Sequence, residues 1–598
     1  MARINLPEWL VFLVLLTIQV AGFNAYAADP RTSARFYVDT YGLVDPESDT
    51  RVDRAQTIFK RLLRVANRPS DLQPGLRVID SEGQPWAIAL PDGFVIISRG
   101  TLDVCYGGAA LDVGDTRLAL ILGHELAHLT HHDFWHRDVH LTLGEQPNAT
   151  SEDFRRRIAA FAGTASTGNP ETWKEQVRQR ELIADDQGFM FASLAGFPTS
   201  QLLEHSDGNR SFFDYWVSST RMGVDTLHAD TTERASLLRA RFDSVKKKVE
   251  LFDNGIRLLT LGRIDDAISF LRTFNKAYPA AAVNNNLGFA FLHRAFQSMH
   301  PDDAARFWLP GMVDVLNPLL EYRYLGGSDS SKTIKGYLET AVAYLEKAAD
   351  TDPDHLASRI NLATAHWYLG DYHKARAVIE EARGIDPANM AVLSLRALIL
   401  QFQEQDIDMW PVASGILKNL ASVEPAPLPV LFNLARMMEQ RSRASQALEY
   451  WNQLYIRRNN LPEIYRQVVC EKAQGGPCDA PGHAVSQSNI AEALIGRSVD
   501  GQADNTSQNW QLRRFNVDTT AVRLLDDSAG VQFLELDDHL EIVIVEARKE
   551  VNLPDFERLT GSPVAVWPMA RGEIRIYPGQ IVTIVEDGRI VSAWWSRS

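Results

Sequence analysis

A spacing that recurs along the middle of the chain constrains the fold more than any other feature. A glycine is followed by an alanine after 5 residues and by a proline after 17 residues, first at Gly262 and again at Gly370. The unit between Pro353 and Pro387 has the 34-residue period of a helical-hairpin repeat. This period predicts stacked helix pairs, in which small residues allow close approach and large residues fill the grooves.

A longer-range recurrence supports this interpretation. The tripeptide Asn-Leu-Ala at 361–363 recurs 72 positions later, at 433–435. We therefore interpret residues 248–472 as an array of tetratricopeptide-type repeats, some of them degenerate. An ordinary helical bundle without a solenoid is the alternative.

The composition excludes several classes of protein. The 598 residues are 45% hydrophobic and 23% charged, which is typical of globular domains and not of disordered or multi-span membrane chains. The net charge of −15 would repel a phosphate backbone, so we expect no nucleic-acid partner. The 3 cysteines are too few for a disulfide-framed fold or a Cys-rich zinc module, so a bound metal would need His and carboxylate ligands.

The N-terminus predicts export. Arg3 precedes an uncharged apolar run at 10–23, and Ala25 and Ala27 suit cleavage before Ala28. The run of 14 residues is shorter than the roughly 20 that a spanning helix needs, although an uncleaved anchor is the alternative. No Cys lies at the cleavage site, so we expect no lipid anchor. These features predict a signal peptide at 1–27 and a periplasmic chain without a stable membrane span after cleavage.

Export to an oxidising compartment would allow the cysteines to form a disulfide. In an oxidising compartment Cys470 and Cys478, with Gly-Gly-Pro between them, could form a disulfide. Cys105 would then remain as a buried thiol without a chemical role.

The N-terminal region predicts a small α+β domain. Residues 31–65 show apolar positions every three or four residues, as in an amphipathic helix. Two β-rich runs flank the turn at 91–93, which predicts a hairpin that ends near Ser98, with a strand edge just before the next helix. That helix covers 115–132 and is apolar for most of its length.

The sharpest motif in the chain lies on this helix, at residues 124–128. On a helix His124 and His128 lie one turn apart on the same face, where both can bind one ion, and Glu125 projects beside them toward a bound water. Unpaired imidazole and carboxylate groups would be costly within an apolar helix, which argues against a purely structural role. A catalytic zinc usually has three protein ligands and one position for water, so a third ligand is required.

The third ligand is less well determined. The metzincin pattern requires Gly and His at positions that are His131 and Phe134 here, so that branch is excluded. Glu181 and Asp185 lie four residues apart on one predicted helix face, so Glu181 could coordinate the ion and Asp185 could accept a hydrogen bond from a ligand imidazole. Spacing alone leaves four other carboxylates open, namely Glu145, Glu152, Glu171 and Glu175.

These motifs in combination resemble a known peptidase family. GHELAHLTHHD, RELIADDQG and the preceding ALPDGFVIISRGTL are similar to the family of HtpX and the CaaX prenyl endopeptidases, and secreted members with tetratricopeptide repeats, of the BepA kind, share the architecture. The resemblance covers about residues 36–245 and implies Glu181 as the third zinc ligand. The sequence departs from the family at Asp92, where Gly is common, and at Ala229, where Pro is usual.

The mechanism that we expect follows from these residues. A zinc ion at this site would acidify a water and polarise a peptide carbonyl, and Glu125 would act as general base. The strand at 95–98 could bind an extended substrate at the sheet edge. Arg234 and His228 are candidate oxyanion stabilisers, and His228 could instead occupy the open zinc position and hold the enzyme latent, although surface or structural roles remain the alternatives.

Two further features carry less weight. The histidines of the 131–140 segment favour an exposed helix end over a second metal site; they are His131, His132, His136 and His140. Short β-branched runs past the linker at 473–509, with a hairpin turn at Asp587-Gly588, predict a small β-rich domain at 510–598 without an assigned role.

The predicted fold class is therefore α+β and mainly α, with a gluzincin-type metalloprotease domain at 28–247, the repeat array and the β-rich domain. The predicted function is a metalloendopeptidase with one zinc ion, which cleaves unfolded or misassembled exported polypeptides and uses its repeats to bind substrates or an envelope assembly-machinery partner. A chaperone or assembly adaptor with a latent or vestigial protease domain is the main alternative. An envelope structural protein anchored through the β-rich end is another.

Overall fold

The computed structural model describes most of the chain in two compact units, Met1–Val245 and Lys246–Ser598. The described residues are 33–68, 72–81, 85–134, 170–202, 205–206, 210–212, 215–216, 231–314, 329–402, 408–474, 476, 487–495, 510–527, 531–537, 539–547, 550–561, 563, 565–568, 572–577 and 581–596. The predicted signal peptide lies outside them. No helix within these ranges is both long and apolar enough to span a membrane.

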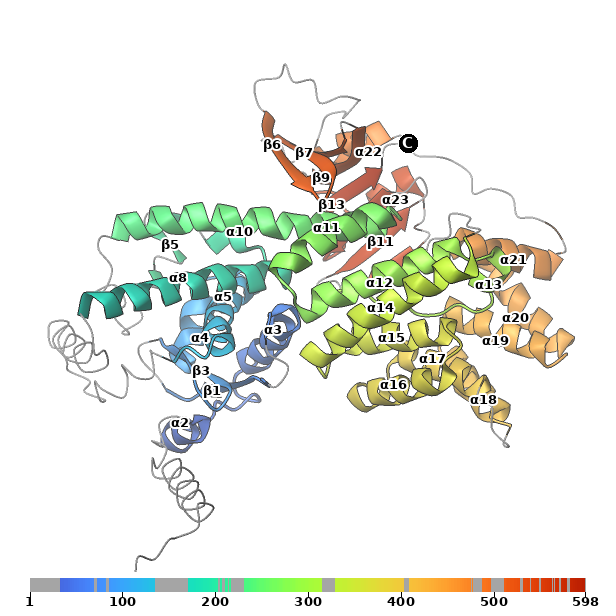
Figure 1. The fold of residues 1–598 in the computed structure, drawn as a ribbon, viewed down its shortest axis with the longest axis horizontal. Helices are drawn as coiled ribbons and strands as arrows, with labels where there is room; N and C mark the ends of the chain where they lie inside the picture. The colour runs from blue at the N-terminus through green and yellow to red at the C-terminus, as the bar shows by residue number, and fades with distance from the viewer. Residues whose placement is uncertain are drawn as a thin grey trace, which may run out of the picture. The chain divides into compact units, whose positions relative to one another are not determined.

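The first unit contains a three-stranded sheet of order β1-β3-β2, of which β1 and β3 are labelled in Figure 1. The predicted hairpin is confirmed: β2 (Ala87–Ala89) pairs antiparallel with β3 (Phe94–Ser98), and Gly93 takes a φ of +89° at the turn. The predicted strand edge at 95–98 is wrong, because β1 (Gly75–Ile79) pairs in parallel with the other side of β3. β3 is the central strand, so no substrate strand can add to it.

Helices form the rest of this unit. The prediction of one amphipathic helix over 31–65 is wrong, because Gly42, whose φ is +77°, ends α2 (Ala34–Tyr41), and α3 (Arg51–Val65) begins only at Arg51. Asp115 fixes α5 to its neighbours, because Arg54 of α3 donates two hydrogen bonds to it, at 3.0 and 2.6 Å, and Tyr106 of α4 donates a third, at 2.8 Å. The helices are α2 (Ala34–Tyr41), α3 (Arg51–Val65), α4 (Arg99–Tyr106), α5 (Leu111–Thr130), α8 (Pro170–Leu194), η2 (Thr199–Leu202) and α10 (Thr231–Thr260), which continues into the second unit, and the short strands are β4 (His205–Ser206) and β5 (Arg210–Ser211).

Two glycines allow α5 and α8 to cross closely. A Cβ atom added at Gly188 of α8 would lie 2.9 Å from the backbone nitrogen of His124, and one added at Gly123 of α5 would lie 3.0 Å from the carbonyl oxygen of Gly188. A side chain at either position would therefore press on backbone of the other helix. This crossing brings the two sequence motifs together.

The second unit contains the predicted array of helical hairpins, in which successive long helices pack on one another and α12 packs on α14, past the short α13 (Figure 1). The glycines of the repeat spacing end helices: Gly262 and Gly370 have φ values of +78° and +79°, which disfavour other residues. The helices are α11 (Ile264–Ala277), α12 (Ala281–Ser298), α13 (Pro301–Ala304), α14 (Ser331–Thr351), α15 (Leu356–Tyr368), α16 (Tyr372–Ile385), α17 (Met390–Gln401), α18 (Trp410–Ala421), α19 (Leu428–Gln440), α20 (Ala444–Ile456), η4 (Arg458–Asn460) and α21 (Glu463–Gln474).

The β-rich domain is an antiparallel sheet of 8 strands, in the order β10-β11-β12-β13-β9-β8-β7-β6. The hairpin at Asp587-Gly588 joins β12 to β13, with φ values of +49° and +74°. The domain begins earlier than the predicted residue 510, because α22 (Gln487–Ile495) lies in the expected linker and buries Ile490 and Leu494 in the domain core. The other elements are β6 (Trp510–Val517), β7 (Thr520–Asp527), β8 (Val531–Leu536), β9 (His539–Glu546), α23 (Leu553–Thr560), β10 (Ala565–Pro568), β11 (Glu573–Tyr577), β12 (Ile581–Glu586) and β13 (Arg589–Ser596).

The described cysteines are in the states that the sequence analysis expects. Cys470 is disulfide-bonded, whereas Cys105 is a free, buried thiol. The predicted partner of Cys470, Cys478, lies outside the described residues.

Candidate metal centre

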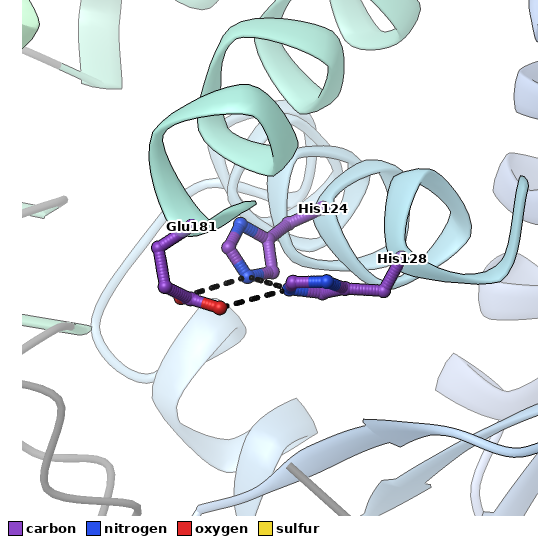
Figure 2. A group of neighbouring side chains, drawn as sticks. All are labelled: His124, His128 and Glu181. Carbon is purple, nitrogen blue, oxygen red and sulfur yellow. Dashed lines mark hydrogen bonds and ion pairs between the residues drawn. The ribbon is translucent and has the colours of Figure 1, made fainter. Parts of the chain in front are cut away.

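Two imidazoles from α5 face each other at the centre of the site (Figure 2). His124 and His128 lie one helical turn apart, and their Nε2 atoms are 3.1 Å from each other. His128 is buried and His124 is half-buried. The helix therefore presents both rings on one face, as the motif predicts.

Glu181 of α8 completes a cluster of three side chains. Its Oε1 lies 3.1 Å from Nε2 of His128 and its Oε2 lies 3.5 Å from Nε2 of His124 (Figure 2). Among the described residues, these three form the group whose ligand atoms lie close enough, within 4.8 Å of one another, to hold one ion. Glu181 is 3% exposed, so its carboxylate is not a solvated helix face.

A carboxylate holds the outer nitrogen of each imidazole. Nδ1 of His124 lies 3.0 Å from Asp185, and Nδ1 of His128 lies 3.3 Å from Asp133. Arg180 donates a hydrogen bond to Asp133 at 3.1 Å, which holds that carboxylate in place. Carboxylate acceptors keep a proton on each Nδ1, so each ring, when neutral, presents the lone pair of its Nε2 to the centre.

This donor set fits a zinc ion. Two Nε2 lone pairs and a carboxylate directed at one another repel unless a cation lies between them. The separation of 3.1 Å between the Nε2 atoms is close to the about 3.3 Å expected for two nitrogens bound tetrahedrally at about 2.0 to 2.1 Å. Two imidazoles and one carboxylate are also a ligand set that catalytic zinc sites use.

Glu125 has the position of a general base. It follows His124 on α5 and is 4% exposed. Its Oε2 atom is buried and has no hydrogen-bond partner among the residues described. A buried carboxylate oxygen without a partner is costly, so this atom is available to accept a proton from a water molecule at the site.

Comparison with known families identifies the domain. Residues 49–307 match the model of peptidase family M48, and residues 335–399 match that of a tetratricopeptide repeat. The chain carries an M48 peptidase domain followed by tetratricopeptide repeats. This architecture supports a metallopeptidase with protein-interaction repeats.

Other comparisons add little. No curated protein matches the chain significantly. A solved structure of a MamA mutant is similar to 35% of this chain over 95% of its own length, with 18% sequence identity and a TM-score of 0.22. Agreement at that level carries no argument about the M48 domain or the repeats.

The electrostatics of the M48 site favour a cation. Burial alone would lower the pKa of both imidazoles, but the surrounding carboxylates reverse this effect. Glu181 and Asp133 raise the pKa of His128 to about 9, and hydrogen bonds to Asp185 and Glu181 raise the pKa of His124 well above its ordinary value. The carboxylates thus outweigh the desolvation penalty for positive charge.

The structure shows which of the candidate carboxylates for the third metal ligand lie near the imidazoles. Glu175 lies on the same helix as Glu181 but is exposed, and its Oε1 accepts a hydrogen bond from Gln179 at 2.7 Å. Glu145 and Glu152 lie outside the described residues, as does the side chain of Glu171. Of these candidates, Glu181 is the described carboxylate that lies against both imidazoles, and its role as the third metal ligand stays a prediction.

The remaining predicted residues lie away from the centre or outside the described part. Nδ1 of His131 donates to the carbonyl of Ala127 at 2.8 Å, and its Nε2 lies 3.2 Å from the Gln187 amide. His132 is exposed at the end of α5. The side chain of Arg234 is not described, and three candidates lie outside the described residues, namely His136, His140 and His228.

Asp133 is the residue that the sequence analysis missed. His132 has a φ of +52°, and after this turn the backbone nitrogen of Asp133 donates to the carbonyl of His128 at 2.9 Å. The turn returns the Asp133 side chain to the ring of His128. A signal was present, since Asp133 directly follows the helix that carries both histidines, but periodicity does not extend past a helix end.

Proposed function

We propose that this protein is a zinc-dependent metalloendopeptidase that hydrolyses peptide bonds in unfolded or misassembled exported polypeptides. The observation that carries the proposal is the convergence of His124, His128 and Glu181 from two helices, with the buried residue Glu125 directly after His124 on α5. His124, His128 and Glu181 would hold one zinc ion. When bound, zinc supplies a Lewis acid and lowers the pKa of a water molecule.

The chain's own residues account for proton transfer and positioning. Glu125 Oε2 accepts a proton from the attacking water and then returns it to the leaving amine. Asp185 and Asp133 keep the imidazoles in the tautomer that directs Nε2 inward, so they act as positioning residues. We place this activity in the periplasm on the basis of the N-terminal pattern at 1–27, and we expect the repeats to bind clients or an assembly-machinery partner.

The test compares cleavage of reduced, unfolded casein by the full mature chain and by its Glu125→Gln variant. We expect one zinc ion per chain in both proteins and a loss of about 10² to 10⁴-fold in the cleavage rate of the variant. Glu175→Gln, on the exposed face of α8, is the matched control and should retain activity.

Stoichiometric zinc without Glu125-dependent cleavage would contradict the proposal and favour the adaptor. A His228→Ala variant is included to test the hypothesis that His228 occupies the open zinc position and holds the enzyme latent. Absence of cleavage in that variant as well would remove latency as the explanation.

A further inference from the structure

A segment inside the repeat array lies buried against the helices without forming a helix or a strand of its own. Residues 305–314, which we call the inner segment, connect α13 toward α14. Phe307, Trp308, Leu309 and Val313 are 1%, 4%, 2% and 0% exposed, respectively. Helical hairpins of this type are usually joined by short turns, so a buried connection of this kind is unusual.

Asparagine side chains hold the backbone of the inner segment. Asn433 accepts from the N–H of Trp308 at 2.8 Å and donates to its carbonyl at 2.9 Å. Asn361 pairs with the N–H and carbonyl of Met312 in the same way, at 2.8 and 2.7 Å.

Asn286 repeats the arrangement at Asp314. It accepts from the N–H of Asp314 at 2.7 Å and donates to the carbonyl of that residue. We call Asn286, Asn361 and Asn433 the asparagine row. All three are 0% exposed.

The asparagine row follows the repeat. Its members lie on α12, α15 and α19, and each is followed by leucine and then by glycine or alanine. The recurrence at 361–363 and 433–435 therefore places an amide at equivalent points of separate hairpins. A packed helix does not need asparagine at a buried position, so the repeated amide requires another explanation.

A side-chain amide complements one peptide unit. Its carbonyl accepts from N–H while its NH₂ donates to C=O, so each pair recognises backbone and not side chain. The aromatic side chains of the inner segment pack against other rings: Trp308 stacks on Tyr465 of α21 at 4.3 Å, and Phe307 meets Trp367 and Phe402 edge-on at 6.0 and 5.6 Å. The buried carboxylate of Asp314, at the end of the segment, instead accepts from Asn285 at 2.9 Å and lies 2.8 Å from Nε2 of His355. The surface thus fits an extended polypeptide with large apolar side chains.

We propose that the asparagine row is a binding surface for an extended apolar polypeptide, and that the inner segment is an internal ligand that another polypeptide displaces. Exchange of one backbone for another preserves every amide pair, whereas an empty row would leave buried polar groups unpaired. The ligand therefore leaves by replacement. This inference deepens the repeat-array part of the proposed function and rests on the expectation that the repeats bind polypeptides, but it requires no catalysis.

The test measures binding of a fluorescent, end-blocked peptide with the sequence of residues 305–314 to the full chain carrying Glu125→Gln, which prevents cleavage. Adding Trp308→Ala weakens the hold of the inner segment on Tyr465 and should tighten binding of the probe at least tenfold. Adding Asn361→Ala to that protein should reverse the gain.

Two controls isolate backbone recognition. Asn284→Ala changes a buried asparagine of α12 whose amide donates to the carbonyl of Ala280 in its own helix, at 3.1 Å, and should leave binding unchanged. A probe N-methylated at its tryptophan and methionine lacks the two N–H donors and should not bind. Absence of binding to the folded Trp308→Ala protein, or equal binding of the methylated probe, would overturn the proposal.

Hydrogen exchange in the unaltered chain covers the case in which Trp308→Ala does not fold. We expect an excess of the unlabelled probe peptide to speed exchange of the Trp308 and Met312 amides at least tenfold and to leave the interior amides of α15 unchanged. Exchange of the Trp308 and Met312 amides only at the rate of global unfolding, with the peptide present, would show that the inner segment is a permanent part of the core. Because neither readout uses peptide hydrolysis, failure here is distinguishable from failure of the proposed enzyme activity.

Discussion

Each imidazole of the proposed metal centre has contacts at both of its ring nitrogens. Its Nε2 faces Glu181 and the other ring, while its Nδ1 faces Asp185 or Asp133. Such outer carboxylates fix ring orientation and increase the basicity of the ligand nitrogen. Metal affinity at this site is therefore expected to depend on residues that do not touch the ion.

Asp133→Asn tests this dependence. Loss of the negative charge at Nδ1 of His128 should raise the dissociation constant for zinc about 10 to 100-fold. The measurement is a competition titration against a chelator of known affinity. Asp186→Asn removes the same charge from α8, where Asp186 pairs with Arg241 at 3.1 Å, and should have little effect. Equal affinities for the two variants would contradict a positioning role for Asp133.

From the pKa of Asp253 on α10 we predict that the stability of the second unit depends on pH. Burial raises the pKa of this carboxyl to about 6, with Glu250 adding to the effect and Arg257 opposing it. The folded state then binds this proton more tightly than the unfolded state, so stability decreases as the pH rises from about 4 through about 6.

Asp253→Asn should remove this penalty. We expect a gain of about 1 to 3 kcal/mol at pH 7 and no gain at pH 4, because a shift of one pKa unit corresponds to about 1.4 kcal/mol. Urea unfolding at a series of pH values measures it. The exposed Asp354→Asn serves as the control for loss of one charge. A gain that is independent of pH would contradict the assignment.

At the residue scale, some residues of the candidate site could be predicted from the sequence and others could not. His124, Glu125 and His128 followed from their spacing on one helix. Glu181 required the family resemblance, because several carboxylates had equivalent spacing. Asp133 could not be predicted, since its position depends on a left-handed turn at His132 after the helix ends.

At the element scale, the site depends on the close crossing of α5 and α8. Gly123 and Gly188 meet where the two helices touch, and neither position has room for a side chain. Glu181 lies two turns before Gly188 on α8, so the crossing sets its distance from the imidazoles.

Gly188→Ala should separate the two helices. The added Cβ would lie 2.9 Å from backbone nitrogen, which cannot move as a flexible side chain can. We expect at least tenfold weaker zinc binding and a parallel loss of peptidase activity, measured by metal titration and by cleavage of unfolded casein.

Gly384→Ala is the matched control for that change. Gly384 lies in α16 with nothing within 4 Å of the added Cβ, so the substitution should be neutral or stabilise by about 0.5 to 1 kcal/mol. Unchanged zinc affinity in Gly188→Ala would show that the crossing does not set the site geometry.

Among the strands, local pairing could be predicted from the sequence, whereas pairing between distant segments could not. The hairpin at 87–98 could be predicted from its turn residues. Its neighbour β1 could not, because parallel pairing between distant segments leaves no local signal, and β3 was therefore assigned to an edge. The helix α22 of the β-rich domain was likewise not predicted, because its short apolar pattern lies within a stretch of linker composition.

At the scale of the whole molecule, the three proposed metal ligands all lie in the first unit. Zinc that binds only the folded state stabilises this unit by about 2.7 kcal/mol at a free concentration of about 100 times the dissociation constant. We expect calorimetry to show one transition that moves upward with zinc and downward with chelator, while the transition of the second unit stays fixed. A shift of both transitions by equal amounts would contradict separate unfolding of the units.

The order of the domains could be read from the sequence, because motif, period and β-rich runs are each local signals. The inner segment could not, since an irregular stretch has no periodicity and its asparagine partners lie up to 125 positions away. The sequence shows the recurrence of Asn361 and Asn433. It does not show that these side chains bind the backbone of the inner segment, because that contact depends on the fold.

The central claim is that His124, His128 and Glu181 hold a catalytic zinc ion. The most direct test follows cleavage of unfolded casein by the full chain after chelation and after stepwise return of zinc. We expect activity to disappear with the metal, to return fully at one zinc ion per chain, and not to return in Glu125→Gln. Cleavage that persists in the metal-free chain, or that returns equally in Glu125→Gln, would contradict it.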